Sequence, residues 1–273
     1  MSDRRHAVRL SPRSAFVIGL ASAGGLLMLL WPLLLQQPGE AVVRPPFVFL
    51  LLLPVVMAVC LAELAEGGID ARVLAVLGVL SAVNAVLRAV SAGTAGVELV
   101  FFLLILAGRV FGPGFGFVLG CTSLFASALL TAGVGPWLPY QMLVSAWIGL
   151  GAGLLPHVRG RAEVVLLAAY GVVSAYLYGL LLNLQGWPLL AGVTVAGHDG
   201  GELAFDPSAS LGANLATFLR YTLVTSTGSY DTMRALTAAL AVCVLGPAVL
   251  TTLRRAARRA TVTGTLPDAV PPG

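Results

Sequence analysis

The sequence predicts an all-α protein, a polytopic membrane helix bundle, and composition is the first reason. Hydrophobic residues occupy 58% of the 273 positions and charged residues 10%, and the mean hydropathy is +0.93. Soluble domains carry roughly 25% charged residues, so this apolar surface indicates lipid as the solvent. The spans must then be helical, because each unpaired backbone group in hydrocarbon costs several kcal/mol.

The length of the apolar runs is the second reason. A membrane span needs about 20 mostly apolar residues. Several runs, such as 14–35 and 164–184, reach this length, whereas the run 97–108 is shorter. The predicted spans cover residues 14–35, 47–64, 71–90, 97–108, 113–130, 140–157, 164–184 and 235–253. A half-apolar segment, 211–225, is expected to be a surface or re-entrant helix. The first run is longer than the about 7–15 residues of a signal-peptide core, so we interpret it as a retained span.

The arginines predict the orientation of these spans. They cluster in residues 1–13, in the loop 157–163 and in the tail from residue 254. With eight spans all three segments fall on one side, and positive residues stay cytoplasmic. We therefore expect a multi-pass protein of the cell membrane with both termini cytoplasmic. The predicted organisation is a basic N-terminus (1–13), two N-terminal transmembrane helices (14–70), a six-helix domain (71–258) and a disordered tail (259–273).

The residue types that are missing narrow the function. All 16 positive side chains are arginines, and without lysine there is no phosphate-binding P-loop, so any ATP must be hydrolysed by another chain. No catalytic motif is visible, and His198 with scattered acids is too few ligands for a metal site. We expect no enzyme activity, cofactor or metal. The net charge of +4 lies mainly at the chain ends, which indicates topology rather than nucleic-acid binding.

A glycine-rich segment, residues 109–156, forms two predicted helices joined by an aromatic turn. Small residues four apart let helices approach closely in lipid, and the pairs Gly116/Gly120 and Gly149/Gly153 are expected to pack inside the bundle. A similar stripe on the third span could instead dock on a partner membrane protein. The stripe consists of Ala71, Ala75, Gly78 and Ala82.

Polar and aromatic side chains near the predicted outer face are the candidate substrate-binding residues. Ionisable residues in spans are costly and point to function, and amides beside aromatic rings give apolar pockets their specificity. The candidates are Asn84, Arg88, Trp137, Tyr140, Gln141, Trp147, Asn183, Tyr230, Asp231 and Arg234.

Several candidates have a structural alternative. Arg88 could extend to lipid headgroups instead of reaching a ligand anion or Glu98. Trp137 could be an anchor in the aromatic belt at the interface. An interhelical hydrogen bond would explain Asn183 equally well, and Asp231 could cap the N-terminus of the last span.

From residue 71 onward the chain resembles the substrate-binding membrane subunit, or S component, of energy-coupling-factor vitamin importers. The residues that carry the resemblance are the alanine-rich third span and several later motifs. These motifs are Gly108-Arg109-Val110-Phe111-Gly112-Pro113, Gly116-x-x-x-Gly120, Trp137, Gln141, Ala146-Trp147-Ile148-Gly149 and Gly151-x-Gly153-Leu-Leu-Pro156. The resemblance implies a six-helix bundle with a vitamin site at its outer side, so the two N-terminal helices would be an addition.

The resemblance also implies the partners: one transmembrane coupling protein, met by the Ala71/Ala75 stripe, and two ATPase subunits. The late segment that contains Asn214, Arg220, Tyr230-Asp231 and Arg234 resembles members assigned to cobalamin-type substrates. Two other functions compete with vitamin capture. One is a stand-alone membrane permease or enzyme, although no carboxylate lies at mid-membrane, and the other is a membrane scaffold protein.

Overall fold

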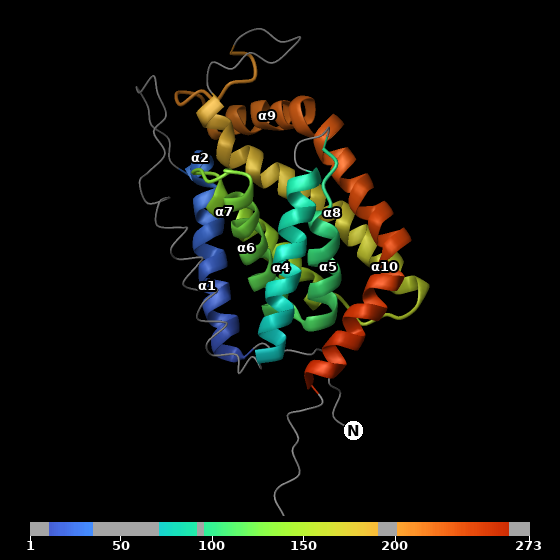
Figure 1. The fold of residues 1–273 in the computed structure, drawn as a ribbon. Coiled ribbons are helices and arrows are strands. Elements are labelled where there is room, and N and C mark those ends of the chain that lie inside the picture. Colours follow the sequence, from blue (N-terminus) through green and yellow to red (C-terminus); the bar gives the residue numbers. More distant parts are fainter. Residues whose placement is uncertain (1–10, 35–70, 92–95, 191–200, 262–273) are drawn as a thin grey trace, which may run out of the picture.

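The computed structural model describes residues 11–34, 71–91, 96–190 and 201–261, and in these ranges every regular element is helical. Figure 1 shows the helices gathered into one bundle. The α-helices are α1 (Pro12–Leu29), α2 (Trp31–Leu34), α4 (Ala71–Ser91), α5 (Val100–Phe111), α6 (Pro113–Leu130), α7 (Leu138–Leu154), α8 (Arg161–Gly186), α9 (Leu211–Thr222) and α10 (Thr232–Thr261). A 3₁₀ turn, η2 (Trp187–Leu190), follows α8, and a π-helical segment, η3 (Leu223–Asp231), joins α9 to α10.

The prediction of a polytopic helical membrane protein is confirmed. Within the described residues, five helical segments are long and apolar enough to cross a membrane: Pro12–Leu29, Ala71–Ser91, Pro113–Leu130, Arg161–Leu189 and Leu211–Arg259. Predicted span 47–64 lies outside the described residues.

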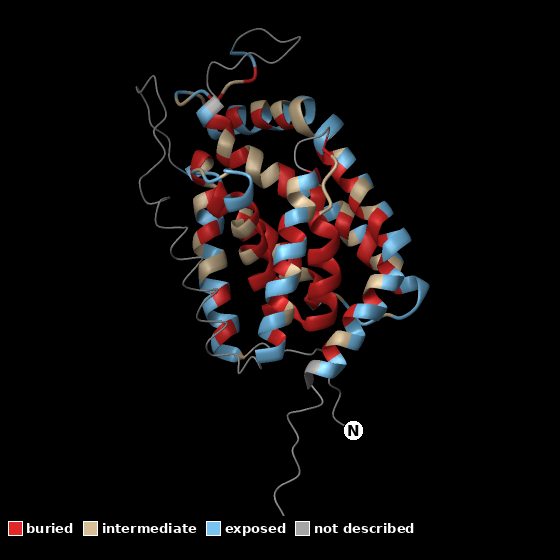
Figure 2. Ribbon diagram, in the orientation of Figure 1, coloured by how far each residue is buried: buried red, intermediate tan, exposed pale blue. Residues whose placement is uncertain are grey.

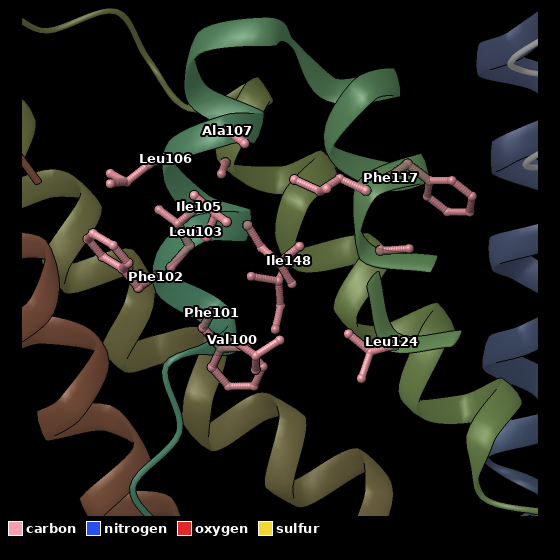
Figure 3. Packing of buried hydrophobic residues seen from close by; sticks show 14 of the residues in the cluster. Val100, Phe101, Phe102, Leu103, Ile105, Leu106, Ala107, Phe117, Leu124 and Ile148 are labelled. Carbon is pink, nitrogen blue, oxygen red and sulfur yellow. The ribbon is translucent and has the colours of Figure 1, made fainter. Parts of the chain in front are cut away.

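Helix α5 is the centre of the bundle, and all of its 12 residues are buried. Figure 2 shows it buried along its whole length, whereas α1, α4 and α10 each expose one face. Twelve residues span only about 18 Å, less than the roughly 30 Å of the hydrocarbon core. A short span is tolerated here because neighbouring helices surround it. Figure 3 shows its side chains, including Phe101 and Ile105, beside Ile148 of α7. All three belong to the apolar core cluster that also contains Phe117 and Leu124 of α6.

The glycine-rich segment packs as predicted. Helix α5 ends at Gly112, whose φ of 111° favours glycine, and Pro113 then starts α6. A Cβ atom on Gly116 would overlap the Gly149 carbonyl, and the reverse also holds, so the backbones of α6 and α7 are in contact. These glycines are therefore packing positions of the bundle core.

The first N-terminal helix, α1, packs on the side of α7 and α8. Gly25 leaves room for the side chain of Leu143. The indole Nε1 of Trp147 donates a hydrogen bond of 2.8 Å to Ser22 Oγ. Most of the remaining surface of α1 is exposed, including Phe16 and Leu20, as expected for a helix that faces lipid.

Helix α9 lies across one end of the bundle, and η3 turns the chain into α10, which runs down its side (Figure 1). Asn214, Phe218 and Thr222 form the buried face of α9, which agrees with the predicted surface helix. Phe218 packs with Trp187 and Phe205 in a small apolar cluster of its own. This cluster fixes α9 to the end of α8.

The opposite end of the bundle carries most of the described arginines. Figure 1 places the starts of α1, α4 and α8 and the end of α10 at this end. The arginines in or next to these helix ends are Arg13, Arg72, Arg159, Arg161, Arg254, Arg255, Arg258 and Arg259.

An ion cluster around the buried pair Arg109 and Glu163 joins the helices at the arginine-rich end. Arg109 Nε donates to Glu163 Oε1 at 2.8 Å, and its Nη atoms donate to the carbonyls of Leu155 and Val158 at 3.0 and 3.3 Å. Arg254 donates to both oxygens of the same carboxylate at 2.6 and 2.7 Å. We call Arg109, Glu163 and Arg254 the Arg109 cluster. It joins α5, α8, α10 and the loop after α7.

Candidate ligand cavity

A cavity of about 310 Å³ opens at the end of the bundle that carries α9. Its walls come from the segment before α5 and from α7, α8, α9, η3 and α10, so the site exists only after the fold has formed. It is lined by Glu98, Gln141, Tyr178, Gly179, Leu182, Asn183, Tyr221, Thr225, Ser226, Tyr230 and Arg234. The lining combines three tyrosines with charged, amide and hydroxyl groups, a combination that binds small polar molecules.

An ion network forms part of the cavity wall. Arg234 donates through Nε to Glu98 and through Nη1 to Asp231 Oδ1, the second at 2.8 Å. Its guanidinium also lies over the ring of Tyr178, 5.0 Å from the centroid, a cation–π contact. We call Glu98, Asp231 and Arg234 the Arg234 cluster. It connects the segment before α5 with the start of α10.

The π-helical segment η3 brings Asp231 into this network. Ser226 Oγ donates to Asp231 Oδ2 at 2.8 Å. A Cβ atom on Gly179 would overlap the Asp231 carboxylate, so only glycine fits at this position of α8. Asp231 was expected as a possible N-cap of the last span, and this was wrong because the helix continues without interruption through η3. π-helical segments are rare in proteins and are frequently found at functional sites.

Arg88 on α4 does not line the cavity itself but contacts Gln141, the lining residue that α7 contributes. Arg88 donates to Ser127 Oγ and to Gln141 Oε1, both at 3.1 Å. Of the alternatives considered for Arg88, contact with Glu98 was wrong, since Glu98 pairs with Arg234 instead. Arg88 thus holds the side chain of a cavity residue in place.

The predicted site residues separate into three groups. Gln141, Asn183, Tyr230 and Arg234 line the cavity. Arg88 and Asp231 bond directly to lining residues. The remaining four candidates, Asn84, Trp137, Tyr140 and Trp147, lie elsewhere.

Each of these four has another environment. Asn84 is buried between α4 and α6 and donates to Ser123 Oγ at 3.0 Å. Trp137 lies in the turn before α7 with 49% of its surface exposed, and Tyr140 is buried in the main core. Trp147 bonds to α1, as described above. The sequence predicted these four residues from their neighbours along the chain, but none of them lines the cavity.

Several lining residues were absent from the predicted set: Glu98, Tyr178, Gly179, Leu182, Tyr221, Thr225 and Ser226. The signal for Glu98 and Tyr178 was present, since both are polar groups at the ends of apolar runs. Thr225 and Ser226 carried no such signal, because a hydroxyl near a span end is common and only η3 turns these two inward.

The predicted docking stripe on α4 faces away from the bundle. Ala71, Ala75, Gly78 and Ala82 are all exposed, and a Cβ atom on Gly78 would meet nothing within 4 Å. The larger neighbours Leu74 and Val79 are exposed as well, so this face of α4 is apolar.

Metal ligands are sparse in the part of the chain that the structure describes, where no group of three or more His, Cys, Asp or Glu side chains comes together. His198 and Asp199 lie outside the described residues. Asp206 is used locally and accepts hydrogen bonds from the backbone and hydroxyl of Ser208.

Comparison with known proteins gives one match. The family model described as "ECF transporter, substrate-specific component" matches residues 72–265, well over half of the chain. No curated protein and no solved structure matches. The matched range contains every residue that lines the cavity and leaves α1 and α2 outside.

Proposed function

Because the chain belongs to the family of substrate-specific components of energy-coupling-factor (ECF) transporters, we propose that it captures a vitamin or related micronutrient in the cavity described above. Partner subunits, one transmembrane coupling protein and two ATPases, would then drive import through the cell membrane. The chain has no lysine for a P-loop of its own, which agrees with ATP hydrolysis by partners.

The proposal rests mainly on the position of the cavity relative to the positively charged helix ends. The cavity lies at one end of the bundle and the arginine-rich helix ends lie at the other. Since arginine-rich ends stay cytoplasmic, the cavity opens to the outside and both termini are cytoplasmic. An outward-facing polar cavity in a membrane bundle is suited to taking up a solute.

The cavity volume favours a compact ligand. At about 310 Å³, it lies at the lower end of the roughly 300–1,000 Å³ range for small-molecule sites. A cobalamin-type substrate, which the late segment of the sequence favoured, is far larger than this cavity and would need to remain largely outside it. We therefore favour a small vitamin over a corrinoid.

The division of the chain is also part of the proposal. The family match begins at residue 72, which supports a transporter domain over 71–258 preceded by an added N-terminal unit over 14–70. Within that domain, the exposed small-residue face of α4 is the surface we assign to the coupling protein. Small residues permit the close helix contacts that drive association in lipid.

A binding assay tests the central proposal. The purified chain in lipid nanodiscs is titrated with riboflavin, biotin, pantothenate, nicotinamide, thiamine and cobalamin by calorimetry, without any partner. We expect saturable binding of a compact member of this set. Absence of binding across the set, together with no co-purifying ATPase, would refute the proposal, and substrate flux in vesicles lacking an ATPase would favour a stand-alone permease.

A second experiment tests the docking surface. Ala82→Leu puts a bulky side chain on the exposed face of α4, and we expect it to reduce co-purification of the coupling protein at least fivefold while ligand affinity is unchanged. Ala169→Leu is the matched control, because Ala169 is exposed on α8, away from the stripe. Equal co-purification by both variants would exclude this face of α4.

A further inference from the structure

For several lining residues, neighbouring contacts determine whether the group can offer the cavity a hydrogen-bond donor or an acceptor. Gln141 Oε1 accepts from Arg88. Arginine is a donor only, so the amide oxygen of Gln141 must face Arg88 and its Nε2 is left for the cavity. The guanidinium also polarises the amide, which makes Nε2–H a stronger donor.

Asn183 supplies a second amide donor. Its Nδ2 atom is buried and has no hydrogen-bond partner among the described residues, although the residue lines the cavity. A buried polar group without a partner costs about 1–3 kcal/mol. Neighbouring atoms cover this nitrogen, so the side chain must turn toward the cavity before a ligand oxygen can accept from it and remove that cost.

The hydroxyl groups of η3 have the opposite character. Thr225 donates its proton to the Tyr221 carbonyl at 2.7 Å, and Ser226 donates to Asp231. A hydroxyl has a single proton, so both oxygens can offer only lone pairs to the cavity. The carboxylate of Glu98 is a further acceptor in the lining.

From these assignments we infer the class of ligand, an inference that rests on the proposed function. It is a compact molecule with a carbonyl or carboxylate oxygen that accepts from Gln141 Nε2 and Asn183 Nδ2. It also has an N–H or O–H group that donates to the oxygens of Thr225 and Ser226. Amides, cyclic ureas and hydroxy acids have this combination. A cation without a carbonyl, such as thiamine, does not.

Near-isosteric variants test the donor assignment. Gln141→Glu keeps the bond from Arg88 as an ion pair but removes the N–H donor, so the fold is retained while affinity falls. Asn183→Asp makes the corresponding change on α8. Nanodisc samples of both variants and of the wild type are titrated with riboflavin, biotin, pantothenate, nicotinamide and thiamine, and their thermal unfolding is recorded. For the carbonyl compound that the wild type binds, we expect Kd to rise about tenfold or more in each variant.

A third variant tests the acceptor assignment. Thr225→Val removes a lone-pair acceptor at nearly constant volume, and we expect Kd to rise about fivefold. Thr252→Val is its matched control: Thr252 makes the same type of bond, to the Ala248 carbonyl at 3.1 Å, on an exposed turn of α10 at the arginine-rich end. We expect the control to leave Kd unchanged.

The outcomes separate this inference from the proposed function. Binding of thiamine alone, or wild-type affinity in folded Gln141→Glu and Asn183→Asp, would overturn the ligand class and leave vitamin capture standing. Binding of cobalamin alone would overturn the ligand class and leave vitamin capture standing. No binding of any of the five compounds or of cobalamin by the wild type would count against vitamin capture itself, and the ligand class would be refuted with it.

Discussion

The two ion clusters of this protein are built from similar residues but differ in what surrounds them. In the Arg109 cluster, Glu163 is bound by two arginines, and Arg109 also donates to two carbonyls. In the Arg234 cluster, one arginine is bound by two carboxylates, and a cavity adjoins it. The first joins helices where no described cavity opens, and the second lines the described cavity.

This difference separates a structural role from a binding role. A buried polar network whose members are all satisfied makes the surrounding structure rigid. Around the Arg234 cluster some hydrogen-bonding groups are not satisfied, since Asn183 Nδ2 has no partner among the described residues. The irregular η3 segment also takes part in this cluster. A hydrogen-bond donor or acceptor that has no partner within the protein is available to a ligand. Each cluster should therefore respond differently to mutation.

The largest expected effect is on the Arg109 cluster. Glu163→Gln leaves the buried guanidinium of Arg109 without its counter-ion, and breaking such a pair costs about 3–5 kcal/mol. We expect a much lower thermal unfolding midpoint in detergent with ligand affinity unchanged within about twofold. Glu202→Gln, at an exposed position, should leave both quantities unchanged. An unaltered midpoint in Glu163→Gln would contradict the structural role of this cluster.

An intermediate effect is expected where α8 meets the Arg234 cluster. Gly179→Ala places a methyl group against the Asp231 carboxylate, and overpacking of this kind costs about 1–3 kcal/mol. Because Asp231 and Arg234 must shift, we expect ligand affinity to fall about tenfold, measured by calorimetry. Gly186→Ala on the same helix is the control, since its Cβ would meet nothing within 4 Å. If both variants bind equally well, the Arg234 cluster does not shape the site.

The smallest effect concerns Trp147, a predicted site residue that belongs to neither cluster. Trp147→Phe removes its hydrogen bond to Ser22, and such interhelical bonds in membranes average about 0.6 kcal/mol. We expect a small drop in thermal stability and no change in ligand affinity. Ser22→Ala should have the same effect, and the double variant should add little. A loss of affinity in Trp147→Phe would place this residue in the binding site after all.

The sequence predicted the helical regions well because their signal is local. A run of apolar residues cannot lie anywhere but in lipid or in the core, so the described helices begin within three residues of the predicted span starts. The ends agree less well, since α10 continues to Thr261 and the predicted span ended at residue 253. The same holds for Gly116 and Gly149, since small residues four apart have few other uses in a membrane helix. The exposed stripe on α4 also followed from spacing along one helix.

The cavity was predicted less completely because its walls come from six separate segments. The sequence identified Gln141, Asn183, Tyr230 and Arg234 as polar groups near the predicted outer ends of spans. It could not show that Trp137 and Trp147 are not part of the cavity lining, since that depends on how α7 and the turn before it pack against their neighbours. The ion pair between Glu98 and Arg234 joins residues far apart in the chain, and no periodicity reports such a contact.

By itself, the sequence determined that this chain is a helical membrane protein, where its spans lie and which end carries the positive charge. These properties depend on hydropathy and charge counted along the chain. Only the tertiary structure decided which polar groups share the cavity and which contacts orient them. That outcome depends on partners from other helices, as when Arg88 orients the amide of Gln141.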